Sequence, residues 1–188
     1  SRFQKSWRAK KNNSGGGVLI MNAIHEIDLL LSLTGIEVKE VFSKCTTNWH
    51  PVDFEDNVSV ILYGSKGEII TIIASNTVRG SKGDLRSNNN DKLKIWGECG
   101  QLIVTNEKID FYSLKQLGQF LPQTWHNLVF KEDLSHRSKF LDYFGDKIKS
   151  NFISGFDERG LVSLTIVKAA YKSSELNRPV GLNELLGN

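Results

Sequence analysis

Apolar and polar positions change from a helical to an alternating period early in the chain. From Val18 to Gly35, the sequence VLIMNAIHEIDLLLSLTG is apolar nearly all round, which predicts a largely buried helix that ends at the glycine. From Val38 onward, apolar and polar residues alternate in VKEVFSKCTTNW, NVSVILYG and EIITIIASNTV. This period of two predicts strands, and the short connection SKG predicts a hairpin between the last two.

The second half of the chain repeats the strand pattern and then returns to helical periods. KLKIWGECGQLIV alternates on both sides of a GECG turn, and KIDFYSL predicts another strand. Two helical patterns follow, LSHRSKFLDYFGDKIKS and a segment that starts near Asp157 and spaces Leu161, Leu164 and Val167 at helical intervals. Residues 79–92 have almost no apolar side chains, which predicts a loop.

This order of elements predicts an α+β fold. We expect a single, mostly antiparallel, open-faced sheet with helices packed on one face. A chain of 188 residues with 39% hydrophobic and 24% charged residues suits one domain that spans residues 1–188. Several strands are apolar on both sides, so we also expect a homo-oligomer that covers the open sheet face.

Charge and cysteine content narrow the function classes. The formal net charge is +3 and no basic run is interleaved with aromatic residues, which argues against a nucleic-acid partner. No window approaches ~18 consecutive apolar residues and the chain does not start like a signal peptide, so we expect a cytoplasmic protein with no membrane partner. The two cysteines lack metal-ligand spacing, so we expect free thiols and no metal.

The polar residues of the first predicted helix gather on one side. At ~100° per residue, Met21, His25 and Asp28 share a side and Asn22 lies on the neighbouring strip. Grouped polar residues are typical of a cleft edge, where Asp28 is placed to hold an imidazole N–H of His25 for general acid/base work. A solvent-exposed surface pair explains the same spacing. The opposite, apolar stripe is formed by Ile20, Ile24, Ile27 and Leu31.

The segment SWRAKKNNSGGGVLIMNAIHEIDLLLSLTG resembles the start of the C-terminal domain of the Gfo/Idh/MocA oxidoreductases, the family of glucose-fructose oxidoreductase and inositol dehydrogenase. The family pattern there is a Trp-Arg pair, a glycine triplet, a helix with Asp-x-x-x-His, then Ile-Asp and a closing glycine. Three further stretches are similar to the family in the right order, so the resemblance covers nearly the whole chain. They are FEDNVSVILYGSKGEIITIIASN, LKIWGECGQLIV and LVSLTIVKAAYKSSELNRPVGL.

The resemblance implies half of an NAD(P)-dependent oxidoreductase. The family pairs this domain with an N-terminal Rossmann domain, which binds NAD or NADP and supplies a catalytic lysine in a Glu-Lys-Pro motif. The sequence has no EKP and no GxGxxG after a strand, so we expect the substrate-binding and oligomerisation half, inactive by itself. The implied reaction transfers a hydride between the cofactor and a secondary alcohol of a sugar, nucleotide sugar or cyclic polyol.

The resemblance also implies roles for single residues. His25 matches the catalytic histidine of the family. Trp7 and Arg8 match the pair that reaches the nicotinamide cofactor. Gly16 and Gly17 would let the chain pass close beneath a bound sugar or cofactor, so they are expected to bind substrate.

One position departs from the family pattern. Met21 stands where the family has the aspartate four residues before the histidine, and methionine cannot ionise. Met21, its polar neighbour Asn22 and Asp28 are the substrate-binding candidates on the helix. The departure leaves His25 as the only titratable residue of the pair, so either the lysine of the Rossmann domain moves the proton or the activity is lost or altered. Three hypotheses stay open: an NAD(P)-dependent oxidoreductase, a non-catalytic sugar-binding or assembly domain of the same fold, and NAD-dependent glycoside cleavage.

The remaining histidines and tryptophans are weaker candidates. Each histidine stands singly, without a partner at a spacing that indicates catalysis or metal binding. The tryptophans could stack on a sugar ring, although packing in a core or interface is the commoner role. These residues are His50, His126, His136, Trp49, Trp96 and Trp125.

Overall fold

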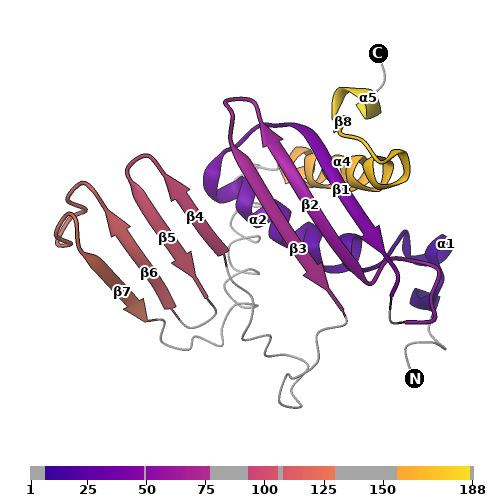
Figure 1. Ribbon diagram of the computed structural model, residues 1–188, viewed down its shortest axis with the longest axis horizontal. Helices are drawn as coiled ribbons and strands as arrows, with labels where there is room; N and C mark the ends of the chain where they lie inside the picture. The colour runs from indigo at the N-terminus through magenta and orange to yellow at the C-terminus, as the bar shows by residue number, and fades with distance from the viewer. Residues whose placement is uncertain (1–6, 49, 77–92, 106–107, 130–155, 187–188) are drawn as a thin grey trace, which may run out of the picture. The chain divides into compact units, whose positions relative to one another are not determined.

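The computed structural model describes residues 7–48, 50–76, 93–105, 108–129 and 156–186. The chain divides into two compact units, one of residues 1–78 with 152–188 and one of residues 79–151. Each unit has its own four-stranded antiparallel sheet (Figure 1). The predicted loop 79–92 and the predicted helix LSHRSKFLDYFGDKIKS lie outside the described residues.

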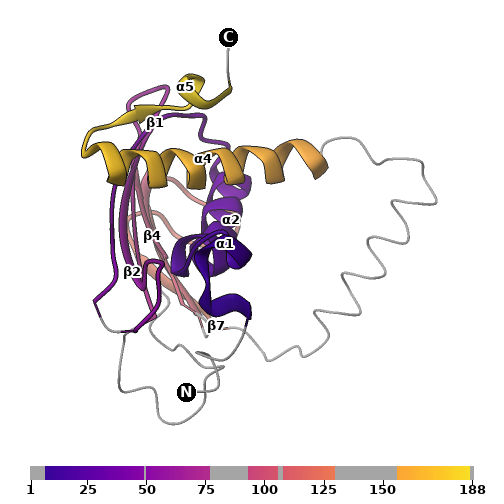
Figure 2. The ribbon, with the colours of Figure 1, turned by 90° about the vertical axis from the view of Figure 1, so that its right-hand side faces the viewer.

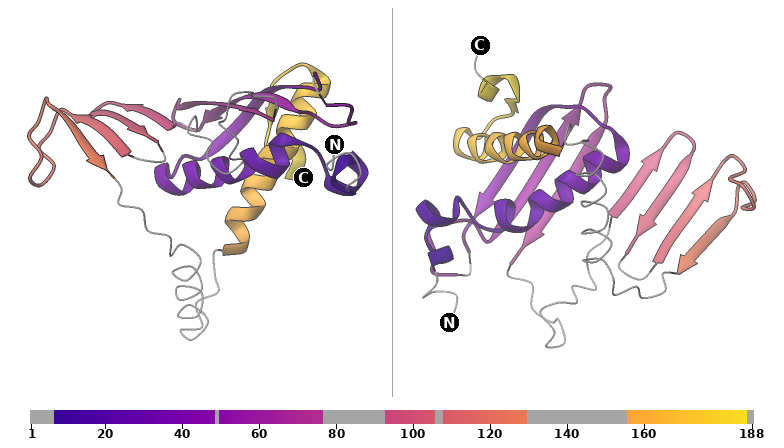
Figure 3. Two further views of the ribbon diagram at one scale, coloured as in Figure 1. Left: turned by 90° about the horizontal axis from the view of Figure 1, so that it is seen from below. Right: turned by 180° about the vertical axis from the view of Figure 1, so that it is seen from behind.

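The first unit is a sheet with helices on one face. Its strands are ordered β3-β2-β1-β8, and all neighbours are antiparallel. Figures 2 and 3 show α2 and α4 on the same side of the sheet. In chain order, the elements are η2 (Trp7–Ala9), α1 (Lys11–Ser14), η3 (Leu19–Ala23), α2 (Ile24–Thr34), β1 (Val38–Thr46), β2 (Asn57–Gly64), β3 (Ile69–Ser75), α4 (Phe156–Leu176), β8 (Val180–Gly181) and α5 (Asn183–Leu186).

The core of this unit lies between the sheet and the helices. Alternate residues of β2, namely Val58, Val60 and Leu62, are buried, whereas Ser59 between them is exposed. Full burial of one such aliphatic side chain contributes about 1.5–3 kcal/mol. The helices complete the core with Leu19, Ala23, Ile27, Ile166, Val167 and Ala170.

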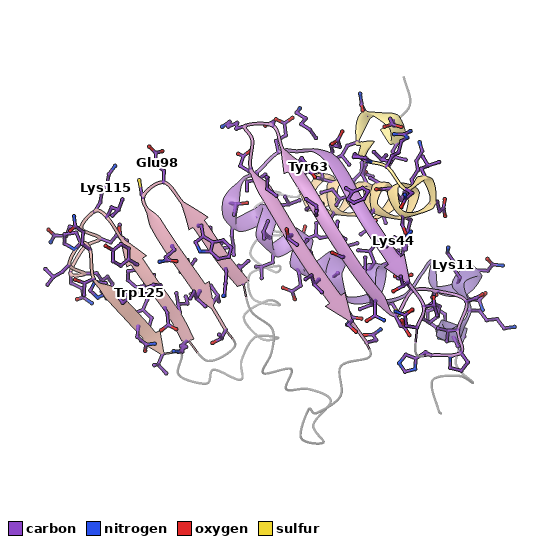
Figure 4. All side chains as sticks on the ribbon, in the orientation of Figure 1. Lys11, Lys44, Tyr63, Glu98, Lys115 and Trp125 are labelled. Atoms are coloured by element: carbon purple, nitrogen blue, oxygen red, sulfur yellow. The ribbon has the colours of Figure 1, made fainter. Side chains whose placement is uncertain are left out.

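The opposite face of the same sheet carries no helix among the described elements. Lys44 and Tyr63 lie on this face, toward the viewer in Figure 4. Ile69 and Ile73 of β3 are 69% and 79% exposed there. The sequence prediction of a sheet that is apolar on both sides is therefore met in β3.

Side chains of α4 cover one edge of β1. The strand pairs with β2 along its whole length, but with β8 only at Glu40 and Val41. Beyond that point, the N–H of Ser43 donates to Ser173 Oγ at 3.0 Å, and the N–H of Cys45 donates to Ser174 Oγ at 2.9 Å. These hydroxyls replace a neighbouring strand, since a buried N–H without a partner costs about 1–3 kcal/mol.

The first long helix departs from regular α geometry. Leu19–Ala23 form a π-helical turn, in which the N–H of Ile24 bonds to the carbonyl of Leu19. The wider turn changes which side chains face the sheet, so the predicted stripe is only partly correct. Ile27 is buried as predicted, whereas Ile20, Ile24 and Leu31 are half-buried and Leu19 and Ala23 take the fully buried positions.

The same helical run is long and apolar. Within the described residues, Lys11–Thr34 has the length and hydropathy of a membrane-crossing helix. Core helices pass the same test, and here Leu19, Ala23 and Ile27 are buried in the core of the first unit.

The second unit is a meander of four strands, β4 (Leu93–Gly97), β5 (Gly100–Val104), β6 (Lys108–Ser113) and β7 (Trp125–Val129). Its aromatic side chains cluster near β7, where the ring of Phe111 lies 5.1 Å from that of Phe120 and 5.2 Å from that of His126. Ser113, at 8% exposure, is the single buried residue in the described part of this unit.

The α+β class with antiparallel sheets is confirmed. The predicted single sheet is found as two four-stranded sheets among the described strands. Gly35 ends α2 in the left-handed conformation, with φ 67°, as predicted. The SKG hairpin is also present, but β7 was not predicted.

Candidate functional site

His25 lies at the start of α2 and is exposed to solvent. Among the described residues, no hydrogen bond to its imidazole is present. Met21 and Asn22 precede it on the π-helical turn η3, with Met21 half-buried and Asn22 exposed. The three residues therefore form a short, accessible strip with one titratable side chain.

Asp28 has a different partner from the one that the sequence predicts. Its carboxylate Oδ1 accepts a hydrogen bond from Ser163 Oγ of α4 at 3.1 Å. The hypothesis that Asp28 orients the imidazole of His25 is therefore not supported. Instead, the bond ties α2 to α4, and Ser163 is buried at this contact.

Gly16 and Gly17 are buried, because side chains of other elements fill the space beside them. A Cβ on Gly16 would lie 2.0 Å from Tyr171 Oη, and one on Gly17 would lie 1.8 Å from the carbonyl oxygen of Glu55. Both distances are far below contact, so each position requires glycine. The structure gives these glycines a packing role, in place of the predicted close approach to substrate or cofactor.

Glu55 holds the start of the helix that carries His25. Its carboxylate accepts the N–H of Gly17 at 2.9 Å to both oxygens and the N–H of Leu19 at 3.0 Å. The side chain is only 5% exposed. A carboxylate is favourable at this position, since it satisfies free N–H groups and the positive end of the helix dipole.

Tyr171 of α4 completes this arrangement. Its hydroxyl donates to Glu55 Oε1 at 2.8 Å. Burial, followed by the charge of Glu55, raises the pKa of Tyr171 well above its usual value of 10, so the hydroxyl stays protonated and remains a donor. Sequence reasoning missed both residues as partners of the helix. The available signals were an acidic FED before a strand and a tyrosine at helical spacing.

Trp7 and Arg8, the predicted cofactor-binding pair, lie together in the 3-10 turn η2. The side chain of Trp7 is 62% exposed. This turn lies just before α1, whose first N–H, that of Lys11, donates to Asp53 Oδ1 at 2.7 Å. More than half of the indole surface therefore faces solvent.

A pocket of about 210 Å³ is lined in part by Glu55 and Tyr171. None of the residues predicted to form the site lines it. Burial raises the pKa of the Cys45 thiol at its wall, so this cysteine is a poor nucleophile at neutral pH. The lining residues are Lys11, Cys45, Thr47, Asp53, Phe54, Glu55, Tyr171, Ser174 and Glu175.

The weaker candidates have structural or surface positions. The backbone N–H of His50 donates to Asp56, and His126 packs against two aromatic rings. Trp96 and Trp125 are 71% and 50% exposed. Trp49 and His136 lie outside the described residues. The described residues contain no cluster of three or more possible metal ligands, and both cysteines are free thiols.

Comparisons with known proteins agree with the resemblance seen in the sequence. The family described as the GFO/IDH/MocA C-terminal domain matches residues 1–103. No curated protein matches the chain in sequence.

Among solved structures, levoglucosan dehydrogenase in complex with NADH and levoglucosan is similar, with 20% identity, a TM-score of 0.75, and coverage of 94% of this chain and 53% of that one. An aldose-aldose oxidoreductase from Caulobacter crescentus, complexed with glycerol, has 20% identity, a TM-score of 0.73, and coverage of 94% and 51%. An NAD binding oxidoreductase from Klebsiella pneumoniae has 17% identity, a TM-score of 0.74, and coverage of 94% and 53%.

At identities this low, the similarity to these structures shows a shared fold alone. The chain spans about half the length of each of these structures. The family match covers more than half of the 188 residues and includes the helix that carries Met21, Asn22 and His25. This chain therefore belongs to the GFO/IDH/MocA C-terminal domain family.

Proposed function

We propose that residues 1–188 form the C-terminal, substrate-facing half of an NAD(P)-dependent oxidoreductase. The whole protein would transfer a hydride between a nicotinamide and a secondary alcohol of a sugar, nucleotide sugar or cyclic polyol. The observation that carries this proposal is the family match over the helix on which His25 is exposed. A similar structure, levoglucosan dehydrogenase in complex with NADH and levoglucosan, supports the substrate class and the cofactor.

The chemistry assigned to this chain is proton transfer. When an alcohol is oxidised to a ketone, its carbon loses a hydride and its hydroxyl loses a proton. An exposed imidazole can accept that proton at a ring nitrogen and return it in the reverse reaction. Met21 has no ionisable group and cannot transfer a proton, and the carboxylate of Asp28 accepts a hydrogen bond from Ser163. His25 is therefore the residue of this strip that we assign to the proton.

We expect a separate Rossmann domain to bind most of the cofactor. A bound nicotinamide would accept or supply the hydride, and Trp7 and Arg8 are the residues that we expect to reach it from this chain. The glycine segment does not suit a phosphate, because the N–H groups of Gly17 and Leu19 already donate to the carboxylate of Glu55.

The first test is cofactor binding by the protein encoded by the complete gene. We expect a chain that includes a Rossmann domain to bind NAD or NADP in a fluorescence titration, whereas residues 1–188 bind neither and are inactive. If the complete protein binds neither nucleotide, the oxidoreductase proposal is wrong.

The second test is the substitution His25→Ala in the complete protein. Loss of a general acid/base group is expected to lower kcat by about 100-fold or more, as measured with the best substrate from a polyol and nucleotide-sugar screen. His50→Ala is the matched control, because that imidazole lies in the loop between β1 and β2, where its Nε2 is 3.4 Å from the carbonyl oxygen of Asn76. Equal rates for the wild type and His25→Ala would remove His25 from the mechanism.

A non-catalytic sugar-binding or assembly domain is the second candidate. Met21 favours it, because the family aspartate is missing from the helix. Sugar binding without turnover by the complete protein would support this alternative.

A further inference from the structure

The strongest unassigned feature is the buried contact among Gly17, Glu55 and Tyr171. It joins three parts of the first unit that are far apart in sequence, with separations of 38 residues for Gly17 to Glu55 and 116 for Tyr171 to Glu55. The carboxylate of Glu55 accepts two backbone N–H groups and one hydroxyl. Its buried charge is therefore stabilised by hydrogen bonds from the helix start and from α4.

Both Glu55 and Tyr171 touch the start of the helix. Glu55 also uses its backbone carbonyl, which accepts the N–H of Val18 at 3.1 Å. Behind the glycines, the hydroxyl of Tyr171 occupies the place where a side chain on Gly16 would stand. The first turn is therefore held by the backbone and side chain of Glu55 and packs against the ring of Tyr171.

The position of the helix start decides the position of His25. Residues 17 to 25 span about 12 Å at about 1.5 Å per residue, so a rotation of about 5° at Gly17 moves His25 by about 1 Å. A misplacement of about 1 Å in a catalytic group can lower a rate by about 100-fold. The π-helical turn η3 lies between the contact and His25, so a shift of the helix start passes through this turn to His25.

We infer that Glu55, held by Tyr171, is a positioning residue that sets the place of Met21, Asn22 and His25 in the substrate site. This inference rests on the proposed function for its effect on catalysis. Its structural part, the control of the η3 turn by Glu55 and Tyr171, does not depend on activity.

The test compares Tyr171→Phe with Ser173→Ala. Both remove one hydroxyl from α4, but Ser173 bonds to Ser43 of β1 and not to the helix that carries His25. In hydrogen exchange of the chain, we expect Tyr171→Phe to speed exchange of the Gly17 and Leu19 amides at least 5-fold and to leave Ser43 unchanged. Ser173→Ala should do the reverse. Equal protection of Gly17 and Leu19 in wild type and Tyr171→Phe would overturn the inference.

Activity supplies the second readout. In the complete protein, Tyr171→Phe should lower kcat about 10-fold with an unchanged Kd for the nicotinamide, whereas Ser173→Ala should keep the wild-type kcat below its own unfolding temperature. A loss of kcat in both variants would mean a general stability effect and would overturn the positioning role.

If the wild-type protein is inactive, the proposed function fails, and the exchange experiment still decides whether Glu55 and Tyr171 control η3. Glu55→Gln, which weakens the same contact, should resemble Tyr171→Phe in both measurements.

Discussion

The two sheets of this chain have the same number of strands but different degrees of burial. In the first unit, β1 and β2 place side chains such as Val41 and Leu62, both 0% exposed, against two helices. In the described part of the second unit, no apolar side chain of β4–β7 is fully buried. A four-stranded meander does not by itself exclude water from either face, so the core depends on the second layer that helices provide.

The largest expected effect tests this difference in burial directly. Leu62→Ala should lower the free energy of unfolding by about 2–5 kcal/mol, because it leaves a cavity in a closed core. Leu102→Ala in β5 should cost much less, since Leu102 is only half-buried and loses less transfer free energy. Urea unfolding of both variants measures the contrast. Equal losses would show that the second sheet has a core of comparable quality.

A smaller effect concerns the uncovered face of the first sheet. If the protein associates through this face, Ile73→Lys should raise the concentration needed for association at least ~10-fold, because a lysine charge would be buried. Leu33→Lys is the matched control, an exposed leucine at 63% near the end of α2. Sedimentation over a concentration series separates the two. A wild-type protein that stays monomeric, or variants that behave alike, would contradict association through β3.

The smallest expected effect concerns the short fourth strand of the first sheet. A hydrogen bond from Arg178, and then one from the N–H of Gly181, lower the pKa of Glu184 to about 2 from its usual 4.5. The stabilisation is therefore complete above about pH 4.5 and is lost as the pH falls toward about 2. Glu184→Gln should be less stable than the wild type at pH 7, and the difference should shrink at pH 3. A pH-independent difference in urea unfolding would contradict this account.

Most elements with a clear period could be predicted from the sequence. The apolar run that ends at Gly35 and the alternation in β1, β2 and β3 are local patterns, and local patterns report which faces are buried. The strand β7 could not be predicted, because it carries Trp125, His126 and Asn127 in a row and depends on pairing with β6 across a long connection. The π-helical turn also escaped prediction, since sequence reasoning assumed a regular α-helix.

The candidate site was only partly predictable for a similar reason. His25, Met21 and Asn22 follow from the family pattern along one helix. The contacts that hold this helix come from distant parts of the chain. One example is Ser163, which lies 135 residues from its hydrogen-bond partner Asp28 on the same helix. Hydrogen bonds between such distant positions depend on the packing of α4 against the rest of the unit, and no local spacing encodes them.

The hydroxyls of Ser173 and Ser174 along β1 have a consequence for the behaviour of the protein at high concentration. An unpaired strand edge offers its N–H groups to strands of other chains and thereby seeds aggregation. Here the N–H groups of Ser43 and Cys45 already donate to those hydroxyls. This edge is thus closed to intermolecular strand addition while α4 stays packed. Partial unfolding of α4 would open a route to fibrillar assemblies.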